Sequence, residues 1–226
     1  MGHSPVPGIQ DSTGTLVLPL WDIHVTSVLN DGVNDDWLFI PQDIPELETI
    51  QQEFLKIFNS FFKDRFAERS YDFWEIDPKM LKLFAPTYLR FLEQQNCLDI
   101  LWTTSFSGSK GDGVRDCPIH IDSKIRDKGP GLCIPIIGCE DSWTIFYDIG
   151  DVEGKENGSR MTMKYEGSME WKEDAATEVG RSPSNVPHWN NIFRPHTALT
   201  NHNDLRLLLC VRFKPELYDR RPGFFK

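Results

Sequence analysis

Apolar residues recur at helical spacing in the first half of the chain. They line one face of a helix predicted over residues 44–66, IPELETIQQEFLKIFNSFFKDRF. A second helix is predicted over residues 78–96, PKMLKLFAPTYLRFLEQQN, with an interruption or kink at Pro86, because proline lacks the amide hydrogen that a helix interior needs. Residues 1–40 combine short apolar runs with turn residues, a pattern typical of short strands. We expect both helices to pack their apolar faces on a sheet.

The pattern changes after residue 96, where short apolar runs alternate with turn residues almost to the end of the chain. These runs are CLDILWTTSF, PIHID, GLCIPIIGC, SWTIFYDI, SRMTMKYEG, HTALT and LRLLLCVRF. Strands that follow one another without intervening helices favour an antiparallel sandwich or barrel over a parallel sheet. The sequence therefore predicts an α+β, mainly β chain that forms a single domain over residues 1–226. Residues 1–96 supply short strands and two supporting helices, residues 97–215 the β core, and residues 216–226 a tail.

Composition limits the classes of function. The formal net charge of -10 argues against a large nucleic-acid-binding face, because affinity for phosphates comes mainly from Lys and Arg. No segment approaches the roughly 20 apolar residues of a membrane span, and the N-terminus has no signal-peptide pattern, so we expect a cytoplasmic protein. Five cysteines without a C-x-x-C pair predict reduced thiols.

The stretch PIHID, residues 118–122, is a candidate metal site. Side chains alternate along a strand, so His120 and Asp122 would share one face and could bind the same ion. Six histidines and 34 acidic residues in 226 positions give about one His-x-acid triplet by chance, so the triplet alone proves little. His202 and Asp204 form the same triplet in NHND, which is typical of a hairpin turn.

An iron site of the facial-triad kind needs a second histidine. The candidate is His196, which opens HTALT and precedes the turn NHND and the strand LRLLLCVRF. Arg206 follows ten residues later, in the second strand of the expected hairpin, where its guanidinium could bind a carboxylate bidentately. His188 in VPHWNN is the rival ligand. If it is not a ligand, we expect it to cap a loop over the site.

Here the sequence resembles a known family. The ordered segments HID, GLCIPIIGCEDSWTIFYD, RPHTALTN and LRLLLCVRF are similar to iron(II)- and 2-oxoglutarate-dependent oxygenases. Within that superfamily they look most like the aspartyl/asparaginyl β-hydroxylase-like and prolyl-hydroxylase-like groups, including oxygenases encoded by bacteriophages. The resemblance covers about residues 97–215 and implies a double-stranded β-helix, also called a jelly-roll or cupin-like core.

The resemblance also implies a site and a reaction. His120, Asp122 and His196 would bind Fe(II), with 76 positions between the two histidines (196 − 120), and Arg206 would anchor the distal carboxylate of the cosubstrate 2-oxoglutarate. With O2, such an enzyme releases succinate and CO2 and hydroxylates a C–H bond of a small molecule, amino acid or peptide side chain. Asp122, where related halogenases have Gly or Ala, favours a hydroxylase.

Several points depart from the family pattern or stay open. Cys133 stands where related sequences often have a polar residue such as asparagine. Arg212 lies six residues after Arg206, so an undistorted strand would turn both to one face, and Arg212 could contact cosubstrate or substrate or pair with an acid. Trp143, Phe146 and Tyr147 are expected to pack the interior of the β core, although one of them could line the cosubstrate pocket.

Two other functions stay open. One is a non-catalytic, cupin-like module that binds a metal or ligand, and the other is a zinc hydrolase with the same ligands and water in the open position. Arg206 distinguishes the hydrolase from an oxygenase, because hydrolysis has no evident need for a carboxylate anchor. A non-catalytic module would show no coupled oxygen consumption.

Overall fold

The computed structural model describes most of the chain from residue 38 onward. The described residues are 38–66, 71–110, 117–121, 130–149, 176–192, 194–201 and 204–220, with four short strands at 9–10, 16–17, 159–160 and 169–171. Two of these short strands, β1 (Ile9–Gln10) and β2 (Leu16–Val17), pair only with each other. None of the helices in this part of the chain combines the length and the apolar character that crossing a membrane would require.

Two six-stranded sheets, antiparallel throughout, dominate the fold, which confirms the mainly β, α+β prediction. The first sheet has the order β3-β12-β7-β14-β5-β4. Its strands are β3 (Phe39–Pro41), β4 (Tyr71–Glu75), β5 (Leu101–Lys110), β7 (Gly131–Ile137), β12 (His188–Asn190) and β14 (Leu205–Phe213). The second sheet has the order β11-β8-β13-β6-β10-β9. Its strands are β6 (Ile119–Ile121), β8 (Ser142–Ile149), β9 (Ser159–Arg160), β10 (Met169–Trp171), β11 (Ala176–Pro183) and β13 (His196–Thr200).

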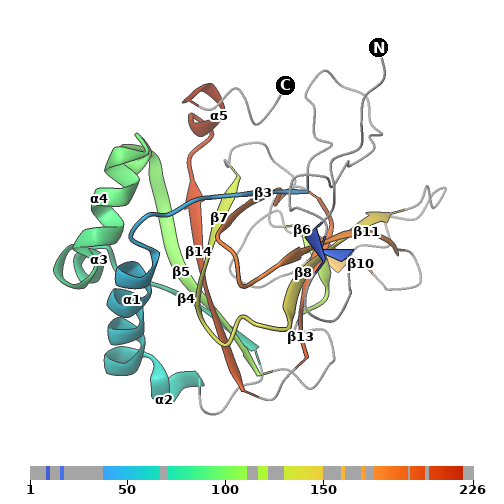
Figure 1. The fold of residues 1–226 in the computed structure, drawn as a ribbon, viewed down its shortest axis with the longest axis horizontal. Coiled ribbons are helices and arrows are strands. Elements are labelled where there is room, and N and C mark those ends of the chain that lie inside the picture. Colours follow the sequence, from blue (N-terminus) through green and yellow to red (C-terminus); the bar gives the residue numbers. More distant parts are fainter. Residues whose placement is uncertain are drawn as a thin grey trace.

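The helices cover one face of the first sheet, and the second sheet lies on the other side (Figure 1). They are α1 (Leu47–Phe61), α2 (Lys63–Phe66), α3 (Pro78–Phe84), α4 (Pro86–Gln94) and, near the C-terminus, α5 (Leu217–Arg220), with a 3₁₀ turn at Leu98–Ile100. The predicted interruption at Pro86 is confirmed, because α4 starts there. The Glu53 carboxylate of α1 accepts hydrogen bonds from the backbone N–H groups of Thr87 and Tyr88, at 2.9 and 3.1 Å, and so caps α4.

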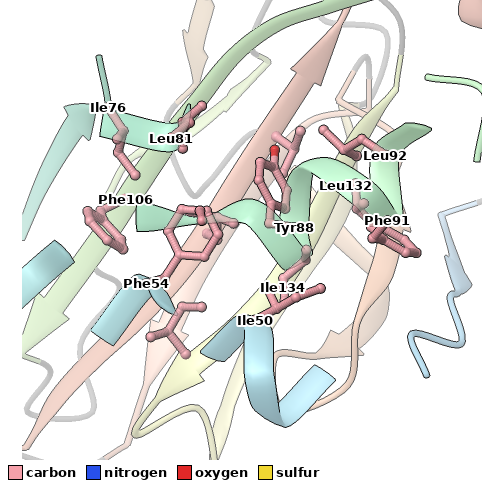
Figure 2. Close-up of a cluster of buried hydrophobic side chains, with 14 of the residues drawn as sticks. Ile50, Phe54, Ile76, Leu81, Tyr88, Phe91, Leu92, Phe106, Leu132 and Ile134 are labelled. Carbon is pink, nitrogen blue, oxygen red and sulfur yellow. The ribbon is translucent and has the colours of Figure 1, made fainter. Parts of the chain in front are cut away.

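The main hydrophobic core lies between these helices and the first sheet (Figure 2). Phe54 of α1 is fully buried and makes edge contacts with Tyr88 of α4 and Phe106 of β5, with ring centroids 5.0 and 6.0 Å apart. Aromatic truncations in such cores cost about 3–5 kcal/mol. The core therefore holds the first sheet against the helices. It thereby sets the position of the backbone from which the side chains on the opposite face of the sheet extend.

The strand β14 shows how the sequence divides the first sheet into two faces. Leu207, Leu209, Val211 and Phe213 are buried in the helix-side core, while Arg206, Leu208, Cys210 and Arg212 alternate with them. We call this second side the inner face. It is directed toward the second sheet, as the hydrogen bond of 3.1 Å between the hydroxyls of Ser109 in β5 and Thr200 in β13 shows. The inner face is unusually polar for a buried surface, because it includes serines, a histidine and arginines.

One sequence prediction is wrong, and two features of the sheets were not predicted. The strands β13 and β14 do not form a hairpin, because β13 pairs with β6 and β8 and β14 pairs with β5 and β7. The connection between them instead crosses from one sheet to the other. Residues 71–75 form the edge strand β4, which was not predicted. In β8, Phe146 pairs with His196, whereas Trp143 and Tyr147 pack with Ile145 on the opposite face of the second sheet.

Candidate metal and carboxylate site

His120 and His196 lie side by side in the second sheet. They are direct cross-strand partners in β6 and β13, and their ring centroids are 4.6 Å apart. Two imidazoles that bind one ion at right angles, with metal–nitrogen bonds of about 2.1 Å, have ring centres about 4.5 Å apart. The separation of the two rings therefore fits two neighbouring ligands of a single metal ion.

Backbone carbonyls set the orientation of both rings. Nδ1 of His120 lies 2.9 Å from the carbonyl oxygen of Pro118, and Nδ1 of His196 lies 2.8 Å from that of Arg194. A carbonyl only accepts hydrogen bonds, so each neutral imidazole carries its proton on Nδ1 and its lone pair on Nε2. This is the tautomer and the second-shell contact of a metal-binding histidine. His196 is 6% exposed and contacts Phe146, so the protein holds it in place.

The third predicted ligand, Asp122, lies outside the described residues. It directly follows β6, in which His120 occupies the central position between the buried residues Ile119 and Ile121. Within the described part of the chain, no three His, Cys, Asp or Glu side chains gather in a way that could hold a metal ion. The structure thus brings together two of the three predicted ligands, and the role of Asp122 stays a prediction.

Arg206 is almost completely buried on the inner face of the first sheet, with 1% of its surface exposed. Its Nη2 donates a hydrogen bond of 3.2 Å to the hydroxyl of Ser184. Among the described residues, Nε and Nη1 have no hydrogen-bond partner. Ser184 is itself held in place, because its backbone N–H donates to the carbonyl of Ser142 at 2.9 Å. The unmatched nitrogens lie on different edges of the guanidinium, so a carboxylate bound bidentately would accept from one of them and from the second N–H of Nη2.

A row of four residues crosses the middle of the inner face. His188 of β12 is opposite Cys133 of β7, which is opposite Cys210 of β14, which in turn is opposite Ser105 of β5. The hydrogen bond with Cys133 and, after it, burial raise the pKa of the Cys210 thiol, and the positive charges of Arg212 and Arg206 act in the opposite direction. Both arginines therefore act on the same buried thiol, as their even spacing along β14 predicts.

Arg212 lies next to Gly131 at the start of β7. A Cβ atom at position 131 would overlap the Arg212 guanidinium and would also approach Ile192. The absence of a side chain at Gly131 therefore leaves the room in which this guanidinium lies. The predicted placement of Arg206 and Arg212 on one face is consistent with these contacts, while their binding roles stay predictions.

His188 has its Nδ1 atom 2.8 Å from the carbonyl oxygen of Val186, in the segment before β12, and its role as the cap of a loop over the site stays a prediction. It is the first residue of β12, is 1% exposed, and belongs to the first sheet, whereas His120 and His196 belong to the second. Burial lowers the pKa of His188 to about 4, so its imidazole is neutral at pH 7. In the described structure, the direct partner of His120 is His196 and not His188.

The sequence reasoning missed the contributions of Ser184 and of β12. The side chains of β12 alternate between the two faces of the sheet. Trp189 packs in the helix-side core, and His188 and Asn190 are on the inner face. That alternation is present in the sequence, but three residues are too few to distinguish a strand from a loop.

The comparisons with known proteins found distant structural similarity only. No protein-family model matches the chain, and no curated protein matches it. Among solved structures, HygX from Streptomyces hygroscopicus with nickel and 2-oxoglutarate bound is 12% identical, with a TM-score of 0.44, and the match covers 81% of this chain and 82% of that chain. The epimerase SnoN in complex with Fe3+, alpha ketoglutarate and nogalamycin RO is also 12% identical, with a TM-score of 0.42 and coverage of 81% and 79%. The non-heme monooxygenase ThoJ, as a nickel complex, is 11% identical, with a TM-score of 0.38 and coverage of 81% and 74%.

Proposed function

We propose that this chain is an iron(II)- and 2-oxoglutarate-dependent oxygenase with a jelly-roll core. The strand order supports the jelly roll. The strands β5, β6, β7 and β8 alternate between the first and the second sheet, and the strands β11, β12, β13 and β14 alternate between the second and the first. Strands β8 and β11 both lie in the second sheet. Eight antiparallel strands distributed in this way over two facing sheets are the arrangement of a jelly roll.

Arg206 is the observation that carries the proposal. A buried arginine without a carboxylate partner is costly, because the desolvation penalty of a charge in a protein interior is several kcal/mol. Among the described residues, the hydrogen-bond partner of its guanidinium is the neutral hydroxyl of Ser184. A ligand carboxylate would supply the missing charge and accept the unmatched N–H groups. A metal-binding module or a hydrolase would not require such a carboxylate anchor.

The residues of the chain then have separate roles. His120, Asp122 and His196 would hold the iron, and Arg206 with Ser184 would hold the distal carboxylate of 2-oxoglutarate, with Arg212 as a further cosubstrate or substrate contact. When bound, iron with 2-oxoglutarate supplies the oxidising chemistry that consumes O2 and releases succinate and CO2. We propose hydroxylation of a C–H bond in a small molecule, amino acid or peptide side chain as the outcome.

The test is an anaerobic titration of metal-free protein with Fe(II) and then 2-oxoglutarate, followed by visible absorption. The chelated cosubstrate gives a charge-transfer band in the wild type, and we expect His196→Ala to lose it while its far-UV circular dichroism is retained. A wild-type protein that is folded and binds iron but shows no band would contradict the proposal and would favour a structural metal or a hydrolytic reaction.

A further inference from the structure

His188 is a buried polar side chain to which the proposed function gives no role. Its Nδ1 lies 2.8 Å from the carbonyl oxygen of Val186, so Nδ1 carries the proton of the neutral ring and Nε2 carries a lone pair. Among the described residues, Nε2 has no hydrogen-bond partner and is buried. A buried acceptor without a partner costs about 1–3 kcal/mol, so a ligand atom is the natural partner for it.

The position of His188 points to the carboxylate that Arg206 binds. Both side chains are on the inner face of the first sheet, and the positive charge of Arg206 is close enough to contribute to the low pKa of His188, after the larger effect of burial. A carboxylate at the unmatched donors of Arg206 would therefore also lie within the electrostatic range of the imidazole. A carboxylate oxygen and a neutral Nε2 are both acceptors, however, and they would repel each other.

The groups around His188 leave an anionic ligand as the source of a negative charge that could stabilise the protonated ring. The thiol of Cys133 is its direct cross-strand partner in β7, and the thiol of Cys210 and the guanidinium of Arg206 act on it from β14. Phe39 of β3 packs edge-on against the ring at a centroid distance of 5.9 Å and has no charge. Thus no described carboxylate stabilises the protonated ring, and an anionic ligand would be the first negative charge near it.

We propose that the carboxylate bound by Arg206 also contacts Nε2 of His188, and that His188 takes up a proton when this anion binds. Protonation turns Nε2 into a donor and replaces an acceptor–acceptor repulsion by a charge-assisted hydrogen bond. The inference rests on the proposed function and assigns to His188 a binding role in the same site. His188 is then part of the selectivity for an anionic cosubstrate over a neutral analogue.

The pH dependence follows from the signs of the shifts. The pKa of His188 is about 4 in the free protein, and a neighbouring anion raises the pKa of a histidine. Because the pKa of His188 is higher in the complex than in the free protein, His188 increases the affinity for the anion at low pH. This gain is lost as the pH rises through the pKa of the complex. The thiol of Cys210 does not contribute to proton uptake, because the contact with Cys133 and burial raise its pKa and it is already protonated in the free protein.

Isothermal titration calorimetry of the full chain with 2-oxoglutarate tests the inference. The protein is loaded with Ni(II) so that His120 and His196 are held by metal and do not titrate. Titrations at about pH 6 and about pH 8, each in two buffers of different ionisation enthalpy, give the number of protons taken up. The variants are His188→Gln, which retains a neutral donor, and His188→Phe, which has neither donor nor acceptor, after circular dichroism has confirmed that both are folded.

We expect the wild type to take up a fraction of a proton at about pH 6 and less at about pH 8, and His188→Gln to take up none. His188→Phe should bind 2-oxoglutarate about tenfold more weakly or worse at about pH 6, the effect of one charge-assisted hydrogen bond. Proton uptake that persists in His188→Gln, or its absence from the wild type, would overturn the inference.

The Arg206→Gln variant separates the two proposals. If 2-oxoglutarate binding depends on Arg206 but proceeds without proton uptake, the proposed function stands and the role of His188 is wrong. If Arg206→Gln binds 2-oxoglutarate as tightly as the wild type does, or if neither protein binds it, then both proposals are wrong.

Discussion

Replacing Arg206 with methionine should affect stability and ligand binding in opposite directions. In the ligand-free protein, the guanidinium is 1% exposed and, among the described residues, has the Ser184 hydroxyl as its hydrogen-bond partner. Replacing a whole buried ion pair by apolar residues of similar volume is often neutral or stabilises a protein by about 1–4 kcal/mol, and a buried charge without a counter-charge should follow the same trend. The loss of the hydrogen bond to Ser184 offsets about 1 kcal/mol of this. The free energy of unfolding of Arg206→Met should therefore be equal to that of the wild type or higher by up to about 3 kcal/mol.

The same change should remove most of the affinity for 2-oxoglutarate. Truncating one partner of a buried, hydrogen-bonded charge pair costs about 2–5 kcal/mol, which corresponds to a loss of about 30-fold to several thousand-fold in affinity. Arg206→Lys should bind better than Arg206→Met, because lysine retains the charge, but worse than the wild type, because it lacks the two parallel donors.

Differential scanning fluorimetry and calorimetry check both parts. For a chain of this length, 1 kcal/mol shifts the Tm by about 2–4 °C, so ligand-free Arg206→Met should melt at the wild-type temperature or up to about 10 °C above it. Added 2-oxoglutarate should raise the Tm of the wild type only. A ligand-free Arg206→Met that melts well below the wild type would refute the reasoning, because it would mean that the guanidinium is already compensated in the free protein.

Three further predictions concern the histidines and the turn after β7. His120→Ala should lose the charge-transfer band of iron and 2-oxoglutarate and keep its far-UV circular dichroism, whereas a retained band would exclude His120 as a ligand. Burial lowers the pKa of His188 from 6.5 to about 4, so between these pH values the unfolded chain binds a proton at this histidine more readily than the folded chain does. The free energy of unfolding should therefore fall by about 3 kcal/mol as the pH is lowered from about 6.5 to about 4. His188→Gln should flatten this part of the curve of urea-unfolding free energy against pH, and an unchanged slope would contradict the assignment. Gly138 has a φ of 60°, and a Cβ there would overlap the Leu205 carbonyl oxygen, so Gly138→Ala should lower the unfolding free energy by about 2 kcal/mol or more. Gly180→Ala is the matched control, because its Cβ would meet only the flexible end of the Leu38 side chain and should cost less.

The helices and most strands could be predicted because their signals are local. The apolar face of residues 44–66 and the break at Pro86 follow from periodicity and from the missing amide hydrogen of proline, and α1, α3 and α4 lie where these signals placed them. The runs GLCIPII, SWTIFYDI, HTALT and LRLLLCVRF all form strands. Their antiparallel character followed from the absence of helices between them.

The pairing of strands could not be predicted from local pattern. His196 and Arg206 are ten residues apart, and a short polar connection usually joins hairpin partners, yet the two residues lie on different sheets. Which strand pairs with which is decided by contacts between distant segments, such as His196 with His120 and His188 with Cys133. The pairing of His120 with His196 agrees with the predicted ligand set, whereas the inner-face row of His188, Cys133 and Cys210 could not be predicted.

The alternation along β14 gives the two faces of one strand different neighbours and different roles. Leu207, Leu209 and Val211 contact the helices and determine how well the fold holds together, whereas Arg206 and Cys210 face the space between the sheets. Substitutions at odd-numbered positions of β14 should therefore change thermal stability at nearly constant ligand preference. Substitutions at even-numbered positions should change ligand preference, so the two properties of this protein can be engineered on neighbouring residues of the same strand.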